Sequence, residues 1–361
     1  MKITRSEKMN CLFLVSDEGY GHTVRQSCIA NELVKRGAKI TFQCRDPVPL
    51  ATKILDKRIK INEYFNLIRL VKREGGVDIE RTYNLFQNYI TRSKEWIRDM
   101  LNSPHVLNAD LIVTDIVEEA GVLSKELNKP AVAISHFTWH WLLRELDPRF
   151  EEVSQYLEEC LSGISEFLYP PFSKYPEQFP NSKPINLIVR KPRKREEVRE
   201  ELGNKDDDIV ILFAGGGTSV WRGLLSSINI NKKKGIVFLS DLPAVSDNIK
   251  QVSKPFRLHD YINASDLVIS RGGYGTISET LAYGIRHLIL VEENHPEAIE
   301  NAKMLKKVNR AVVRNLNDFL NNPYDLIEEA LNTKMNLSPI RSDGHIQAAN
   351  RLFQIWEKCC L

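Results

Sequence analysis

Short apolar runs alternate along the chain with segments whose apolar residues recur every three or four positions. The first run covers residues 11–16, and a helical pattern at 23–36 follows it after a loop that contains two glycines. A second apolar run covers residues 39–44. A strand, a glycine loop, a helix and a further strand in this order predict a doubly wound parallel sheet.

The same alternation continues through the rest of the chain and predicts an α/β protein. Further strands are predicted at residues 59–65, 110–115, 131–135, 208–214, 235–240, 267–270, 287–292 and 311–314. Further helices are predicted at residues 81–101, 117–127, 193–202, 296–307, 317–331 and 344–358.

A cluster of six prolines between residues 169 and 192 separates two halves of this pattern. Since 361 residues exceed what one core usually organises, the cluster is predicted to mark a domain boundary. We expect one domain in residues 1–180, a second in residues 185–340, and a final helix in residues 341–361 that could pack back on the first domain.

Charge and cysteine usage exclude several classes of function. A formal net charge of +3 is too small to indicate nucleic-acid binding, and the basic run at residues 190–195 is balanced by the glutamates after it. No apolar stretch approaches the roughly 20 residues of a membrane span, so at most a peripheral association with a membrane is expected. The cysteines lack the spacing of a zinc site, which predicts reduced thiols, no metal and a cytoplasmic location.

The stretch from Leu267 to Gly284 is the first candidate for chemistry. Three glycines, Gly272, Gly273 and Gly275, separate an apolar strand from a helical pattern that begins at Thr276. Backbone N–H groups and the helix dipole converge at such a turn, which favours a phosphate-bearing ligand. The alternative is structural, because Thr276 and Glu279 have the spacing of a capping box that would close the helix start without any ligand.

The arrangement of these motifs resembles that of the GT-B glycosyltransferases. The second-domain pattern is Ser270-Arg-Gly-Gly-Tyr-Gly-Thr-Ile-Ser-Glu279, followed by Gly284, Glu297 and Asn301-Ala302. The first domain adds the loop Gly19-Tyr-Gly-His22. The resemblance implies a GT-B fold, in which two doubly wound Rossmann-like domains face a central cleft.

A narrower resemblance is to the amino-terminal, glycosyltransferase-like half of plant L-arabinokinases. It rests on Gly19-Tyr-Gly-His-Thr-Val-Arg25, Asp110-Leu-Ile-Val-Thr-Asp115, Ser135-His-Phe-Thr-Trp139, Leu187-Ile-Val-Arg190 and Gly273-Tyr-Gly-Thr-Ile-Ser-Glu279. The sugar-kinase half of those proteins has no counterpart in this sequence, so the resemblance implies no kinase activity.

His22 is the implied general base that would deprotonate an acceptor hydroxyl, and a neutral imidazole suits that task. Asp115, at the end of its predicted strand, would orient His22 and stabilise the imidazolium. Each has a structural alternative, since His22 could cap the following helix and Asp115 could begin the helix after it. Arg25 would meet a phosphate or an acceptor carboxylate, or lie on a solvated helix face.

The resemblance implies a nucleotide-sugar site that lies mainly in the second domain. Glu279 would accept hydrogen bonds from the ribose hydroxyls, and glycine-loop amides would bind the diphosphate. The full predicted set is Gly21, Gly215, Gly216, Gly217, Thr218, Ser270, Arg271, Gly272, Gly273, Gly275, Thr276, Glu279 and Glu297. The chain departs from the pattern at Ala298, where many relatives have a glutamine that holds the donor sugar.

On the acceptor side we expect Arg25, His136 and Trp139. The aromatic residues after the predicted strand at 131–135 could stack on a sugar ring, or they could belong to the core.

The function implied is transfer of a sugar from a nucleotide-sugar, expected to be a UDP-sugar, to a hydroxyl acceptor, with the nucleotide-sugar as co-substrate and no other cofactor. Two alternatives stay open. A sugar-nucleotide hydrolase or epimerase uses the same fold, and a non-catalytic nucleotide-sugar-binding module would fit the missing glutamine. The sequence does not determine the oligomeric state.

Overall fold

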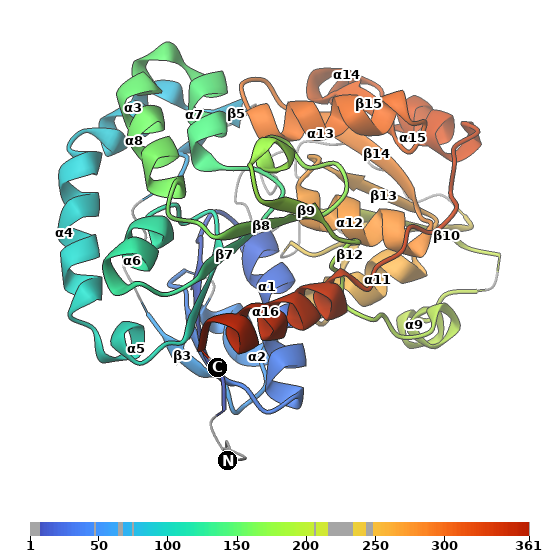
Figure 1. The fold of residues 1–361 in the computed structure, drawn as a ribbon. Coiled ribbons are helices and arrows are strands. Elements are labelled where there is room, and N and C mark those ends of the chain that lie inside the picture. The colour runs from blue at the N-terminus through green and yellow to red at the C-terminus, as the bar shows by residue number, and fades with distance from the viewer. Residues whose placement is uncertain are drawn as a thin grey trace.

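The computed structural model describes residues 8–46, 48–63, 68–73, 76–205, 207–215, 234–242 and 248–360. Figure 1 shows two sheets side by side, each with helices packed on its faces. Apart from one two-stranded hairpin, every strand pairing is parallel, which confirms the predicted α/β class. Within the described ranges no helix is both long and apolar enough to cross a membrane.

The first sheet has seven strands in the order β3-β2-β1-β6-β7-β8-β9. Their central members are apolar and buried, as expected of parallel strands covered on both faces. The strands are β1 (Asn10–Val15), β2 (Lys39–Gln43), β3 (Lys60–Asn62), β6 (Leu111–Asp115), β7 (Ala131–Ile134), β8 (Glu166–Tyr169) and β9 (Ser182–Pro184), with the hairpin β4 (Lys72–Arg73) and β5 (Gly76–Val77) outside the sheet. The helices are α1 (Tyr20–Lys35), α2 (Val48–Ile54), α3 (Ile79–Phe86), α4 (Tyr89–Leu101), α5 (Pro104–Leu107), α6 (Ala120–Leu127), α7 (Trp139–Leu146), η1 (Pro148–Phe150), α8 (Glu151–Leu161) and η2 (Pro176–Gln178).

The second sheet has six strands in the order β12-β11-β10-β13-β14-β15. The strands are β10 (Ile209–Ala214), β11 (Ile236–Ser240), β12 (Ile249–Gln251), β13 (Leu267–Ser270), β14 (Arg286–Val291) and β15 (Val312–Asn315). The helices are α9 (Arg195–Leu202), η3 (Pro255–Arg257), α11 (Leu258–Ala264), α12 (Tyr274–Tyr283), α13 (Pro296–Lys307), α14 (Leu316–Asn321) and α15 (Pro323–Asn332).

Both sheets reverse their strand order at one place, between β1 and β6 in the first sheet and between β10 and β13 in the second. In open α/β sheets a crevice forms outside the carboxyl ends of the strands at such a switch point. His22 and Asp115 follow or end the first pair of strands, and Gly215 and the glycine turn follow the second pair. The topology therefore directs both sets of predicted site residues towards crevices.

The last helix, α16 (Gly344–Cys360), lies against the first sheet and crosses α1, as Figure 1 shows. Ala348, Ala349, Leu352 and Ile355 join the same buried cluster as residues of β1 and β2. The Arg351 guanidinium donates to both carboxylate oxygens of Glu166 at 2.6 Å. The chain thus passes from the first domain to the second and returns.

Two predicted helices are each divided into two. The predicted helix at 81–101 is interrupted at two residues, since the extended backbone of Gln87 (ψ 132°) ends α3 and Asn88, with a left-handed backbone (φ 61°), is the N-cap of α4. The predicted helix at 317–331 is interrupted at Asn322, because Pro323 begins α15 and cannot continue the hydrogen bonding of α14. The prediction omitted α7, α8 and β8, which lie between residues 139 and 169. It also omitted the short elements α2, α5, α11, β4, β5, β9 and β12.

Candidate functional site

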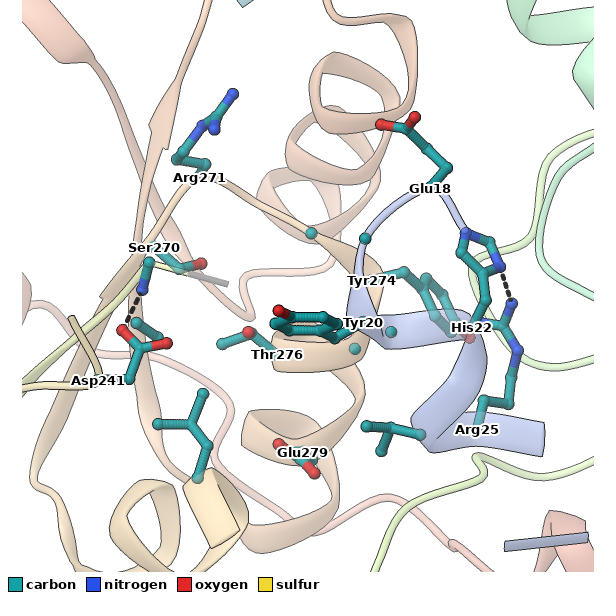
Figure 2. A pocket seen from close by; sticks show the side chains of 18 of the residues that line it. Glu18, Tyr20, His22, Arg25, Asp241, Ser270, Arg271, Tyr274, Thr276 and Glu279 are labelled. Carbon is teal, nitrogen blue, oxygen red and sulfur yellow. Dashed lines mark hydrogen bonds between the residues drawn. The ribbon is translucent and has the colours of Figure 1, made fainter. Parts of the chain in front are cut away.

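A cleft of about 520 Å³ lies between the two domains. Figure 2 shows that His22 and Arg25 on α1 contribute to one wall, and that Thr276 and Glu279 on α12 contribute to the other. Most of the predicted site residues that the structure describes line this cleft, and they are Gly21, His22, Arg25, His136, Gly215, Ser270, Arg271, Gly273, Gly275, Thr276, Glu279 and Glu297. Gly216, Gly217 and Thr218 lie outside the described residues.

His22 and Asp115 are in direct contact. Helix α1 begins at Tyr20 after Gly19, whose φ of 75° favours glycine, so His22 lies in the first helical turn rather than in a loop. Asp115 is fully buried at the end of β6, next to Val15 in the register. His22 Nδ1 lies 2.9 Å from Asp115 Oδ1. The structure thus brings together the two residues that sequence reasoning paired.

Asp115 is a carboxylate in this site. Burial opposes its ionisation, but the Arg25 guanidinium and His22 hold its pKa well below its usual value. Arg25 donates to it at 2.7–3.0 Å and the Gln26 amide at 2.9 Å. His22 Nδ1 faces two groups, since Asp115 Oδ1 can only accept and Arg25 Nη2, also 2.9 Å away, can only donate. The tautomer that suits catalysis is the one whose Nδ1 proton is donated to Asp115. His22 Nε2 then carries the lone pair that a general base needs.

Arg25 is committed to this network. Its side chain is 5% exposed, and besides Asp115 it donates through Nη1 to His136 Nδ1 at 3.1 Å. The predicted contact of Arg25 with an acceptor therefore competes with a buried ion pair inside the protein.

The glycine turn of the second domain begins helix α12. Gly272 has a φ of 80°, Gly273 is the N-cap, and α12 starts at Tyr274. A Cβ added to Gly275 would lie 3.5 Å from the Cα of Gly21, which is van der Waals contact, so the backbones of α1 and α12 approach each other closely at their first turns. The first turns of both helices line the cleft, which favours negative charge between them.

The capping box suggested by the sequence does not form. Since α12 begins at Tyr274, Glu279 lies in the second turn of the helix, and the helix start has no side-chain cap. Burial raises the pKa of Glu279 above its usual value, although the nearby Arg190 guanidinium opposes the shift. Arg190 Nη2 donates to Glu279 at 3.1 Å and its Nη1 donates to the Phe256 carbonyl at 2.7 Å.

Gly215 and Arg271 already have protein partners. The Gly215 N–H donates to Asp241 Oδ1 at 2.7 Å. The Arg271 guanidinium pairs with Glu292, and burial lowers its pKa to about 10. A phosphate that used either group would have to share it with a carboxylate.

His136 and Glu297 join the two domains. His136 Nε2 lies 2.9 Å from Glu297 Oε1, and the His136 ring stacks on Tyr274 with centroids 4.0 Å apart. Burial lowers the pKa of His136 to about 4, so the ring is neutral at physiological pH. Burial also opposes ionisation of Glu297, but His136 and other neighbours hold its pKa well below the usual range.

Trp139 is not at the cleft, which corrects the acceptor-side prediction. Its side chain is fully buried and packs with Phe137 and the apolar face of α7 in a first-domain cluster. The aromatic run begins helix α7, and the helical geometry directs Trp139 towards the core. Of the predicted acceptor residues, only Arg25 and His136 line the cleft.

Several charged cleft residues were not predicted, and they are Glu18, Lys53, Lys72, Arg190, Asp241, Glu292 and His295. Lys72, on the hairpin, pairs with Glu18 at 2.6 Å. Most of these residues lie in loops or on the hairpin, Lys53 lies on the short helix α2, and Glu292 directly follows β14. Arg190 did have a signal, since it ends the segment Leu187-Ile-Val-Arg190 of the resemblance and begins the basic run at residues 190–195. In the described part of the chain, no three His, Cys, Asp or Glu side chains are grouped as a metal site requires.

Glu118, three residues after Asp115, gives a test of the buried charges beside the site. Burial and the neighbouring Glu119 raise its pKa to about 8 from the usual 4.5, so the native state binds more protons in this window and stability falls as the pH rises. The free energy of unfolding of the wild type should fall by a few kcal/mol as the pH rises towards 8, at about 1.4 kcal/mol per pKa unit. Glu118→Gln, which can still accept from the Trp139 N–H, is expected to lack this pH dependence. Urea unfolding of both proteins at about pH 6 and about pH 9 measures the difference. An equal pH dependence of stability in the wild type and in Glu118→Gln would contradict this prediction.

Comparison with known proteins identifies the class of this architecture. Residues 238–351 match the family model Glycosyltransferase family 28 C-terminal domain. The chain is 25% identical over 285 residues to L-arabinokinase of Arabidopsis thaliana, covering 76% of this chain but 27% of that protein. It is 25% identical over 324 residues to an uncharacterized glycosyltransferase of Methanosarcina mazei, covering 83% of this chain and 84% of the relative.

The comparison with solved structures supports the fold described above. The crystal structure of CalG4, the calicheamicin glycosyltransferase, matches with a TM-score of 0.61 at 13% identity, covering 98% of this chain and 95% of the other. The predicted GT-B fold and the resemblance to the amino-terminal part of L-arabinokinase are confirmed. The family model and the relatives support a glycosyltransferase. Because the chain spans about a quarter of the L-arabinokinase, the activity of that whole protein is not carried over.

Proposed function

We propose that this GT-B glycosyltransferase moves a sugar from a UDP-sugar to a hydroxyl acceptor, with His22 as the general base. The observation that carries the proposal is the position of the His22–Asp115 pair. His22 lies on the first turn of α1 and lines the same cleft as the glycine turn of α12, while Asp115 holds it from the end of β6. Sugar transfer with a diphosphate leaving group requires a general base and a group that stabilises the leaving anion. Here His22 and the N-terminus of α12 would supply them in one cleft.

In the proposed reaction His22 Nε2 accepts the proton of the acceptor hydroxyl as the oxygen attacks the anomeric carbon. Asp115 stabilises the imidazolium that forms, and it is already ionised and fixed by Arg25 and Gln26. The bond between the sugar and the diphosphate breaks, and the N-terminus of α12 stabilises the negative charge on the leaving nucleotide.

The proposed binding roles are assigned to residues that line the second-domain side of the cleft. Glu279 would accept from the ribose hydroxyls and Glu297 from the donor sugar, since both carboxylates line the cleft on the second domain. The reaction as proposed uses no metal or other cofactor, because helix starts and cleft cations can stabilise the diphosphate. The spacing of the cysteines favours a cytoplasmic location.

Thermal unfolding with a panel of nucleotides tests the donor site. We expect one UDP-sugar to raise the melting temperature of the wild type, by an amount equivalent to about 2.7 kcal/mol at a ligand concentration near 100 times Kd. UDP, GDP and GDP-sugars serve as comparison ligands. Glu279→Ala is expected to lose most of this ligand-induced shift, because the ribose contact disappears.

Glu328→Ala is the matched control, since Glu328 is exposed on α15 and far from the lining of the cleft. Ligand-induced shifts are compared within each variant, because Glu279→Ala also leaves Arg190 without its carboxylate partner. The absence of any shift in the wild type would overturn the proposal. Release of free sugar from the bound donor without an acceptor would replace transfer by hydrolysis.

A further inference from the structure

The two carboxylate oxygens of Glu297, the proposed ligand of the donor sugar, differ in their hydrogen-bond partners. Oε1 accepts from His136 Nε2 at 2.9 Å, from the Tyr274 N–H at 3.4 Å and from the Asn301 amide at 3.5 Å. Oε2 has no hydrogen-bond partner among the residues that the structure describes. Since Glu297 lines the cleft, one oxygen is held by the protein and the other remains for a ligand.

The orientation of His136 is fixed on every side. Its Nδ1 faces Arg25 Nη1 at 3.1 Å, and because a guanidinium can only donate, Nδ1 is the acceptor and the proton is on Nε2. Its ring stacks on Tyr274 and meets the edge of Phe137 with centroids 4.8 Å apart. The side chain is 3% exposed. His136 therefore has one tautomer and one rotamer with which to hold Glu297.

The bond between His136 and Glu297 crosses between the domains. His136 follows β7 of the first sheet, whereas Glu297 is in the first turn of α13 on the second sheet. Through Arg25 and Asp115, His136 is also connected to His22. The proposed base and the sugar-binding carboxylate are thus held in one hydrogen-bonded frame, which exists only while the domains are together.

We propose that His136 is the positioning residue for the donor sugar, holding Glu297 so that only Oε2 faces a sugar hydroxyl. The inference rests on the proposed function. It accounts for Ala298, because a carboxylate fixed from the opposite domain needs no neighbouring amide to orient the sugar. Asn301, the other polar residue of this motif, donates to the Gly272 carbonyl at 3.0 Å and so supports the glycine turn.

Two substitutions of His136 separate its two hydrogen bonds. In His136→Gln the amide nitrogen can take the place of Nε2 and donate to Glu297. In His136→Asn the shorter amide can accept from Arg25 but cannot reach Glu297. The affinity of each protein is measured by calorimetry for UDP and for UDP-glucose, UDP-galactose, UDP-N-acetylglucosamine and UDP-glucuronate.

We expect His136→Asn to weaken binding of the wild type's preferred UDP-sugar by about 10-fold, the effect of one lost charge-assisted hydrogen bond, and to change the UDP affinity by less than about 2-fold. His136→Gln should keep the wild-type ratio of the two affinities. His136→Phe, which keeps the stacking on Tyr274 but removes both nitrogens, should behave as His136→Asn does.

Equal losses in the Gln and Asn variants, or a loss of UDP affinity as large as that of the UDP-sugar, would overturn the inference and leave His136 a structural residue. A wild type that binds neither UDP nor any UDP-sugar would be a different failure. That result would overturn the proposed function and, with it, this inference.

Discussion

His22→Ala is expected to lower kcat for sugar transfer by about 10²–10⁴-fold, the usual contribution of a positioned general base, with little change in donor affinity. The fold should tolerate the change, because Asp115 keeps its bonds to Arg25 and Gln26. Initial rates with the donor identified by the nucleotide panel, together with calorimetry for donor binding, measure the two effects separately.

His105→Ala is the matched control, since His105 lies on α5 and outside the cleft lining. It should leave both kcat and donor affinity unchanged. Unchanged turnover in His22→Ala would reject His22 as the base. A wild type that binds the donor without turning it over, and that binds equally well as His22→Ala, would identify a binding module instead.

Asp115→Asn is expected to destabilise the protein by about 3–5 kcal/mol, because it leaves the buried Arg25 guanidinium without its counter-charge. Asp115 is fully buried and Arg25 is 4% exposed, so water cannot replace the lost interaction. The midpoint of urea unfolding, with the slope of the transition checked for two-state behaviour, gives the difference in free energy of unfolding. Loss of activity should accompany it, since an amide can stabilise the wrong tautomer of His22.

The double variant Asp115→Asn/Arg25→Met provides the control, because it removes both charges and should recover part of the lost stability. A single variant as stable as the wild type would show that the pair contributes little.

The pH dependence of stability gives an independent measurement. The folded pKa of Asp115 lies below its usual 3.8, so its stabilisation is present above that pH and is lost as the pH falls towards the folded pKa.

The sequence was sufficient where local patterns dominate. Parallel strands buried on both faces appear as short apolar runs, so most strands of both sheets were predicted within a residue or two. The pairing of His22 with Asp115 was implied by the family resemblance, and the structure supplies its physical reason, since β1 and β6 are adjacent and their carboxyl ends meet at one edge of the sheet. The break at Asn88 had no comparable signal, because a left-handed residue can interrupt an otherwise continuous amphipathic pattern.

Contacts between distant segments could not be predicted. The pair formed by Arg190 and Glu279 joins residues 89 positions apart, and the bond between His136 and Glu297 joins residues 161 positions apart. Trp139 is of a residue type that can stack on a sugar, but the orientation of α7 directs its side chain towards the core. Glu279 had the spacing of a cap, but the helix starts two residues earlier than the pattern indicated.

The return of α16 to the first sheet has a consequence for the order of folding during synthesis. Residues 195–332 contain the elements of the second domain and leave the ribosome before Leu352 and Ile355, which complete the core of the first. Domains generally fold as units while the chain is being made. The domain made first therefore completes its core only after the second domain has been made, and until then the apolar residues that α16 covers stay exposed to water.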